Sequence, residues 1–104
     1  MMRTQNRPPT HPGQILKELY LVPLGISNSK FAEILGVSRG IISSIINEHK
    51  AITPEIALRL SRAFTNTSPE SWLNLQQNYD LWYITHHSYD WQKVQPIPLP
   101  QTIT

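Results

Sequence analysis

Apolar residues recur every three or four positions in five stretches of the chain, and each stretch predicts an amphipathic helix. The expected helices begin near residues 12, 27, 38, 53 and 68, and the first and last end near residues 20 and 84. Serine or threonine, which cap helix N-termini well, stands at four of these starts, and proline opens three of the helices. The pattern therefore predicts an all-α fold of five helices.

The third stretch is the least clear of the five. It carries Ile41, Ile42, Ile45 and Ile46, and β-branched residues favour strands. The serines between the isoleucines and the capping position of Ser38 favour a helix instead.

The two ends of the chain differ from the helical part. Residues 1–10 contain Pro8 and Pro9 and few apolar groups, which predicts a flexible arm. Residues 86–104 end in "QPIPLPQTIT", where alternating prolines exclude a helix and predict an extended tail. A single domain is expected over residues 11–85.

Composition narrows the class of protein. The 104 residues include no cysteine, so disulfides and thiolate metal sites are excluded. The N-terminal segment lacks the apolar region of a signal peptide, and no run approaches the ~18 apolar residues of a membrane span. We expect a soluble, cytoplasmic protein with no membrane contact and no cofactor.

Charge is distributed unevenly along the chain. Residues 1–62 hold eight lysines and arginines against four glutamates, whereas residues 63–104 hold one lysine against three acidic residues. A basic first half suits contact with a polyanion, although a solvated surface has the same composition.

The stretch "FAEILGVSRGIISSII", residues 31–46, has the requirements of a helix-turn-helix. Ala32 permits close packing of the two helices, and Gly36 permits a left-handed backbone in the turn. Apolar anchors stand at the inner positions of both helices: Phe31, Leu35, Val37, Ile42 and Ile45. An ordinary αα-hairpin with a glycine cap is the alternative.

The outer face of the third helix is short, polar and nearly free of acid. Arg39 lies at the N-terminal end, where recognition helices contact base edges, and arginine to guanine is a common specific contact. A phosphate contact by Arg39 is the alternative, and Glu48 is discordant because it repels phosphate. The candidate DNA-binding residues are Asn28, Ser38, Arg39, Gly40, Ser43, Ser44, Asn47 and Lys50.

Residues 27–64 resemble the Cro/lambda-repressor-like helix-turn-helix class. Over residues 11–82, the segments "HPGQIL", "PLGIS", "FAEILGVSRGIISSIIN", "ITPEIALRLSRAF" and "SPESWLNLQQNYDLW" resemble the HigA-type antitoxins of toxin–antitoxin pairs. The resemblance implies a dimer that binds its own operator DNA as an autorepressor. It also implies neutralisation of a small HigB-like toxin, a ribosome-dependent mRNA endonuclease. Glu48 stands where family members often have glycine, and Asn28 where many have glutamine.

The fifth helix carries aromatic and apolar residues at helical spacing. They form more apolar area than one packing face requires, which predicts the interface of a two-fold dimer. A place in the monomer core is the alternative, and the acidic surroundings disfavour a stacking platform for single strands. The candidate interface residues are Trp72, Leu75, Tyr79 and Trp82.

Two other functions are alternatives to that of an antitoxin. A free-standing repressor has the same DNA chemistry without a toxin. A nuclease or hydrolase would need His86, His87 and Asp90 to act together, but adjacent histidines on a helix point about 100° apart. With no phosphate loop, catalytic triad or paired carboxylates, neither an enzyme nor a metal site is expected.

Overall fold

The computed structural model describes residues 7–100, and these residues form helices and no strand. The predicted all-α, helix-turn-helix architecture of five helical segments is confirmed. The predicted arm and tail each extend beyond this range, since residues 1–6 and 101–104 lie outside it. Four shorter segments make up the body: a first composite helix, α3 (Asn28–Leu35), α4 (Arg39–Ile46) and α5 (Pro54–Ala63).

The first helical segment is longer than the sequence predicts. It runs without a break through α1 (Pro12–Ile15), a π-helical stretch η1 (Leu16–Leu21) and α2 (Val22–Leu24), and it ends at Gly25 rather than near Tyr20. Proline has no N–H to donate, and its ring crowds the carbonyl four residues earlier. The wider π turn before Pro23, in which the Val22 N–H donates to the Lys17 carbonyl, accommodates that ring and lets the helix continue.

The core lies where these four segments meet the first turns of α6 (Pro69–His87). Its largest fully buried side chains come from every helical segment, so no helix can leave without exposing apolar area. They are Trp72, Phe31, Leu16, Ile42, Ile45 and Leu60. Thr53 and Ser68 cap α5 and α6 as the sequence predicts, each accepting a backbone N–H of the first turn.

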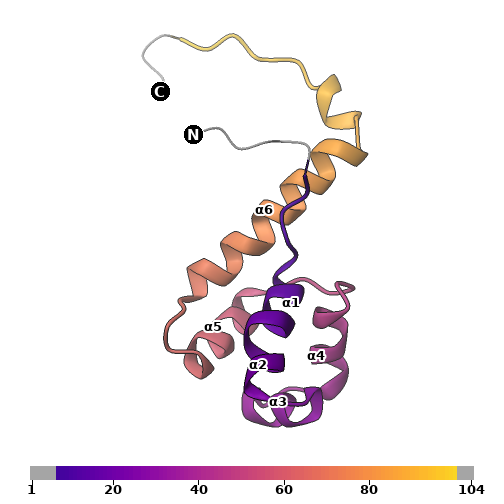
Figure 1. Cartoon of the computed structure of the whole chain (residues 1–104). Helices are drawn as coiled ribbons and strands as arrows, with labels where there is room; N and C mark the ends of the chain where they lie inside the picture. Colours follow the sequence, from indigo (N-terminus) through magenta and orange to yellow (C-terminus); the bar gives the residue numbers. More distant parts are fainter. Residues whose placement is uncertain (1–6, 101–104) are drawn as a thin grey trace.

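Helix α6 gives the molecule its elongated shape, 54 Å along the longest axis (Figure 1). Its N-terminal half packs on α5, and its C-terminal half leaves the body. It ends at His87, three residues beyond the predicted Ile84, where the Ser88 N–H donates to the Ile84 carbonyl at 3.0 Å. The His86 and His87 rings bond the carbonyls of Trp82 and Tyr83 within the last two turns.

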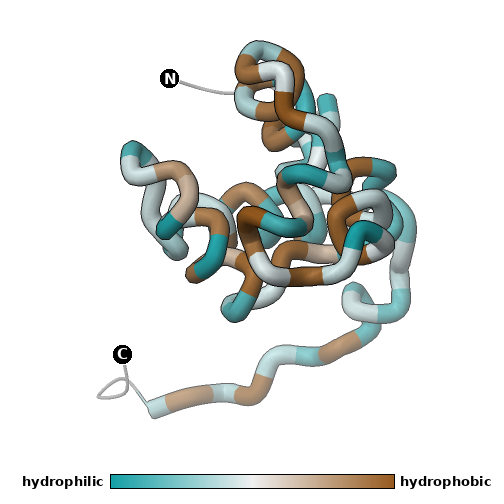
Figure 2. The backbone as a smooth tube through the Cα atoms, turned by 90° about the horizontal axis from the view of Figure 1, so that it is seen from below, coloured by the Kyte–Doolittle hydropathy of each residue, from teal (hydrophilic) through white to brown (hydrophobic). Residues whose placement is uncertain are grey.

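A short 3₁₀ turn, η2 (Asp90–Lys93), follows α6 inside the segment that the sequence predicts as extended. Residues 94–100 then carry no helix or strand, and apolar and paler positions alternate along them (Figure 2). Within residues 7–100 no helix is long and apolar enough to cross a membrane.

Candidate nucleic-acid interface

The corner between α3 and α4 is built from local hydrogen bonds. Ser27 and Ser38 cap the two helices, their hydroxyl oxygens accepting the N–H groups of Lys30 at 3.1 Å and Ile41 at 3.2 Å. Gly36 has φ +74°, so the predicted left-handed turn residue is confirmed. The N–H groups of Gly36 and Val37 turn back to the α3 carbonyls, which closes the helix end.

The inner face of the corner is buried as predicted. Phe31, Ala32 and Leu35 of α3 and Ile42 and Ile45 of α4 belong to the core. This burial fixes which face of α4 points outward.

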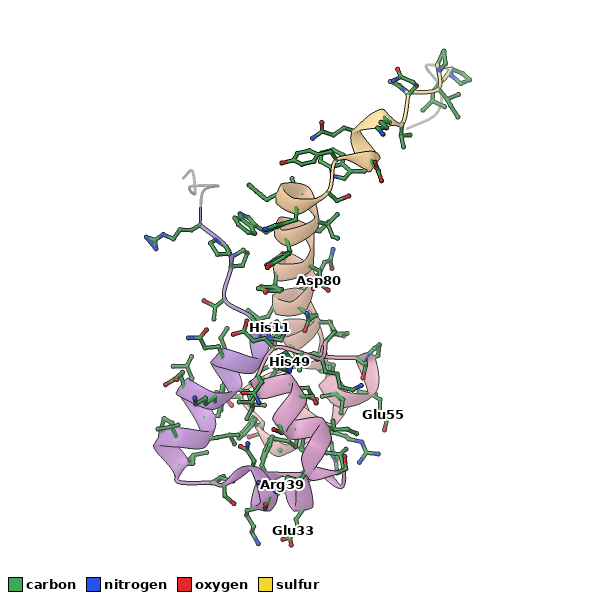
Figure 3. All side chains as sticks on the ribbon, turned by 90° about the vertical axis from the view of Figure 1, so that its right-hand side faces the viewer. His11, Glu33, Arg39, His49, Glu55 and Asp80 are labelled. Atoms are coloured by element: carbon green, nitrogen blue, oxygen red, sulfur yellow. The ribbon has the colours of Figure 1, made fainter. Side chains whose placement is uncertain are left out.

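The outward face of α4 carries the candidate DNA-binding residues. Arg39 occupies the first position of the helix and is exposed, near the lower end of the molecule in Figure 3, below His11 and Asp80. Among residues 7–100, neither Arg39 nor Lys50 forms an ion pair, so both cations remain available to a polyanion. Gly40, Asn47 and Lys50 are exposed, and Ser43, Ser44 and the α3 residue Asn28 are half-buried.

Ser38 is a predicted DNA contact, and the structure shows that its side chain is also the N-terminal cap of α4. Its hydroxyl oxygen already caps α4 through the Ile41 N–H. A contact from this hydroxyl to DNA must therefore leave the cap in place, which keeps the hydroxyl hydrogen free to donate and one lone pair free to accept.

Arg59 of α5 holds the corner from behind, and sequence reasoning missed it. Its Nη1 donates to the carbonyls of Leu35 at 2.6 Å and Gly36 at 3.4 Å, at the C-terminal end of α3. Glu55, one turn earlier, accepts from its Nε at 3.1 Å and lies 3.0 Å from its Nη2. The Glu–Arg spacing of four residues was the available signal, but spacing alone does not reveal which carbonyls the guanidinium reaches.

Gly13 lies where α1 packs against α4. A Cβ added to Gly13 would overlap the carbonyl oxygen of Ile45, so this helix approaches the last turn of α4 as closely as a backbone can. His11 caps the same helix, with its Nδ1 accepting the Gly13 N–H at 2.9 Å.

His11 also connects α1 to α6 and to the exit of α4. The ring is buried and lies edge-on to Tyr79, with centroids 4.8 Å apart. Burial lowers the pKa of the His11 imidazole below its ordinary value, against the opposing effect of the Glu48 and Asp80 carboxylates. The histidine is therefore neutral, with its proton on Nε2.

Glu48 follows α4 with φ +65°, the one non-glycine residue in the described range with a positive φ. A side chain in this left-handed region costs roughly 1–2 kcal/mol. The glycine common at this position in the resembling family would avoid that cost. With glutamate at this position, the chain makes the same left-handed turn after α4 and the backbone of Glu48 is strained.

The predicted interface residues of α6 divide between the core and the surface. Trp72 is 1% exposed and donates its Nε1–H to Thr67 at 2.9 Å, so it has almost no area to offer a partner. Leu75 and Tyr79 are half-buried against the body, and Trp82 is half-buried beneath the His86 ring. For Trp72, the alternative of a core position is the observed one.

The most exposed apolar side chains of α6 are ones the sequence did not select. Leu81 is 57% and Ile84 56% exposed, and both border a groove of about 480 Å³ that Ile52 and Leu73 also line. Their spacing of three residues was visible, but the burial of Trp72 decides which face is left open.

His86 and His87 do not converge on one point. Each ring donates through Nδ1 to the backbone carbonyl four residues earlier, at 2.8 and 2.9 Å. Within residues 7–100, no three histidine or acidic side chains are arranged to hold a metal ion.

Comparison with known proteins extends over most of the chain. Residues 16–72 match the helix-turn-helix family. Virulence-associated protein A of Dichelobacter nodosus is 41% identical over 98 residues, which are 91% of this chain and 94% of that protein. Antitoxin HigA-1 of Vibrio cholerae is 42% identical over 81 residues, 78% of this chain and 75% of that protein. A structure of antitoxin GraA in complex with its operator has a TM-score of 0.80 at 34% identity, covering 95% of this chain and 100% of that one.

Proposed function

Because the chain belongs to the helix-turn-helix family, in its HigA-type antitoxin branch, we propose that it binds operator DNA as a two-fold dimer, represses its own transcription and neutralises a ribonuclease toxin. This is a family of DNA-binding regulators and not of enzymes. The observation that carries the proposal is the unpaired Arg39 at the start of an outward-facing, acid-free α4.

In this proposal α4 enters the major groove with its first turn against the base edges. Its small residues Gly40, Ser43 and Ser44 let the helix approach closely, and Arg39 donates to guanine. Lys50, beyond the end of α4, and the N-terminus of α3 at Asn28 contact phosphates on either side.

Substitution of Arg39 and of Lys50 distinguishes contacts with base edges from contacts with phosphates. Arg39→Ala is expected to cost roughly 1–3 kcal/mol of operator affinity and to relax specificity at one base pair. Lys50→Ala should weaken every duplex alike and flatten the salt dependence. The measurement is a fluorescence-anisotropy titration of operator and random duplexes at several salt concentrations.

Lys93→Ala is the matched control, because Lys93 lies beyond the far end of α6. It should bind like the parent protein. Equal losses on operator and random DNA for Arg39→Ala would show that Arg39 contacts phosphate only. No loss on either would remove α4 from the interface.

A dimer supplies the second recognition helix that an operator with two half-sites about 34–36 Å apart requires. We assign its contact to the groove beside Leu81 and Ile84, since an isologous interface needs an apolar patch that one chain leaves open. Leu75, Tyr79 and Trp82, none of which lines this groove, remain predicted contributors from other sides of α6, and Trp72 does not contribute.

The double variant Leu81→Asp/Ile84→Asp is expected to be a folded monomer, because both side chains are already exposed. It should lose tight operator binding and keep weak, salt-sensitive binding to any duplex. Sedimentation velocity and circular dichroism measure this. The double variant Leu19→Asp/Val22→Asp, at equally exposed positions of the first helix, is the control and should remain dimeric. If the Leu81→Asp/Ile84→Asp variant is still a dimer, the dimer interface lies elsewhere.

Toxin neutralisation is supported by the position of the chain ends. The described part of the arm runs beside the distal half of α6, and the tail starts beyond it, so both lie away from the first turn of α4, where Arg39 stands (Figures 1 and 3). A toxin held there leaves the reading face free, which is compatible with repression by the complex. The partner in this proposal is a small basic ribonuclease encoded beside this chain.

A toxicity-rescue assay with the neighbouring gene product tests this step. Deleting residues 1–10 or, separately, 88–104 should weaken rescue and co-purification while leaving operator binding intact. If neither deletion has an effect, the helical body binds the toxin. If the intact chain neither rescues nor co-purifies, it acts as a free-standing repressor without a toxin.

A further inference from the structure

The distal half of α6 carries two columns of stacked rings, which we call the aromatic ladder: Tyr79, Tyr83 and His87 in one column, Trp82 and His86 in the other. His87 stacks on Tyr83 and His86 on Trp82, each with ring centroids 4.1 Å apart. The Nδ1 bonds to backbone carbonyls hold both histidine rings in place. The ladder is therefore an ordered surface of ring faces and edges rather than a set of independent side chains.

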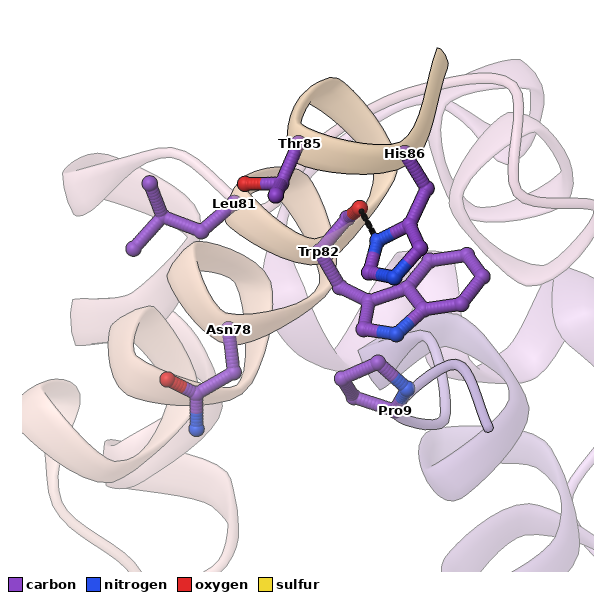
Figure 4. A pocket seen from close by; sticks show the side chains of 6 residues that line it. All are labelled: Pro9, Asn78, Leu81, Trp82, Thr85 and His86. Carbon is purple, nitrogen blue, oxygen red and sulfur yellow. Dashed lines mark hydrogen bonds between the residues drawn. The ribbon is translucent and has the colours of Figure 1, made fainter. Parts of the chain in front are cut away.

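The ladder already accepts proline from the same chain. Pro9 lies beside the Trp82 indole and lines the hollow that Trp82 and His86 border (Figure 4). Pro8 joins Pro9 along a neighbouring groove of about 440 Å³ that reaches Tyr79, Tyr83 and His87. Aromatic-lined grooves recognise proline-rich chains in this manner, because proline is preorganised and offers a flat apolar ring.

The described residues of the arm, from Arg7 to Thr10, cover only part of this surface. Tyr83 is 44% exposed, and His86 and His87 at the distal end are also exposed. The exposed rings of Tyr83, His86 and His87 thus have the chemistry of a second proline site.

The tail is the segment with the matching chemistry. Pro96, Pro98 and Pro100 alternate with Ile97 and Leu99, whose side chains are 78% and 67% exposed. Seven residues from Val94 span about 20 Å when extended, whereas Tyr79 to His87 rises about 12 Å along α6. The tail is therefore long enough to cover the ladder.

The tail is directed away from the ladder of its own chain. Trp91 donates its Nε1–H to the Ser88 carbonyl at 2.7 Å, and Lys93 pairs with Asp90. These two local contacts stabilise the turn after α6. From this turn the tail leaves the helix without returning along it (Figure 1). A second copy offers the other route.

We propose that the tail of one copy, residues 95–100, docks on the distal aromatic ladder of a second copy, beside Pro9. This rests on the dimer of the proposed function. Leu81 and Ile84 lie in the same turns of α6 as Trp82 and Tyr83, so a two-fold contact there brings the partner's tail within its own length of the ladder. The exchange adds an extended-chain contact to a dimer that the α6 contact at Leu81 and Ile84 already holds, so the dimer and its operator binding persist without the tail.

Cross-linking between chains tests the docking, because the chain has no cysteine of its own. A Thr85→Cys chain, with its thiol beside Trp82, is mixed with an Ile97→Cys chain and treated with a short bismaleimide. The yield of linked heterodimer should exceed that of a Glu33→Cys plus Ile97→Cys mixture at least about fivefold, because docking raises the effective concentration. Pro96→Ala/Pro98→Ala in the Ile97→Cys chain should lower the yield to the control value.

Sedimentation of the same samples separates the two proposals. A dimer whose Thr85→Cys yield equals the control overturns the docking and leaves the dimer intact. A monomer overturns both. A Thr85→Cys/Ile97→Cys chain that links within itself, at a dilution where sedimentation finds monomer, also overturns the exchange and makes the tail an internal strap.

Discussion

At the α3–α4 end, the anchors Phe31, Leu35, Ile42 and Ile45 are buried, and both helix starts are capped by serines of the same chain. Along the distal half of α6, by contrast, Leu81, Tyr83 and Ile84 remain about half exposed. The first region is complete as a single chain and presents polar groups to a polar partner. The second has apolar area in excess, which is the property of a surface that is completed by association.

This difference predicts that substitutions in the body around α3 and α4 change the stability of the fold, whereas substitutions in the distal half of α6 change association between chains. The largest effect is expected at Gly13. Gly13→Ala forces a Cβ into the Ile45 carbonyl, so α1 and α4 must separate, at a cost of about 3 kcal/mol in the free energy of unfolding. Urea unfolding followed by circular dichroism measures it.

Gly40→Ala is the control for Gly13→Ala. A Cβ at Gly40 would meet nothing closer than 3.9 Å, and alanine favours a helix, so this variant should be as stable as the parent or slightly more so. Equal stabilities for the two alanine variants would mean that α1 does not brace α4.

Arg59→Met tests the clasp behind the corner. It removes the donors to the Leu35 and Gly36 carbonyls and the pairing with Glu55. Because the Arg59 side chain is 38% exposed, we expect a loss of only about 1–2 kcal/mol in the free energy of unfolding. Operator affinity should fall with it, although Arg59 does not lie on the outer face of α4. Arg62→Met, one turn along the same helix and exposed, should change neither quantity.

Glu48→Gly should have a smaller and opposite effect. Glycine relieves the left-handed strain, which is expected to raise the free energy of unfolding by about 1 kcal/mol. Loss of the carboxylate should also strengthen binding to any duplex. Glu48→Gln separates the two causes, since it removes the charge and keeps the strain. A Gln variant that is stabilised as much as the Gly variant would assign the gain to charge.

The smallest effect concerns pH. Since the pKa of His11 is lowered in the folded chain, the unfolded chain takes up a proton first as the pH falls below about 6.5. Stability should therefore be fully present above that value and decrease toward pH 5. His11→Asn keeps a capping acceptor but does not titrate, so its midpoint in urea should change less between pH 7.5 and 5. Parallel decreases in both proteins would assign the pH dependence to other groups.

The features that could be read from the sequence are those set by local chemistry. The caps at Ser27, Ser38, Thr53 and Ser68 follow from side chains within three residues of the groups they bind. The left-handed Gly36 likewise follows from a short-range steric rule. These elements identify the face of α4 that points outward.

What the sequence did not reveal depends on contacts between distant segments. Arg59 reaches α3 across 24 positions, and Gln76 accepts the Ile52 N–H across the same separation. The choice between Trp72 and Leu81 as the open side of α6 depends on how α6 lies against the body. Periodicity identifies an apolar stripe but not which part of it another helix covers.

Helix α6 also acts as a lever. Its 19 residues make a rod about 28 Å long that is anchored to the body at one end only. If a partner holds the far end, a tilt of one degree about that end moves the other end, together with the body, by about half an ångström. In the proposed dimer, anything that binds near Leu81 thus alters the spacing of the two α4 helices without touching either of them.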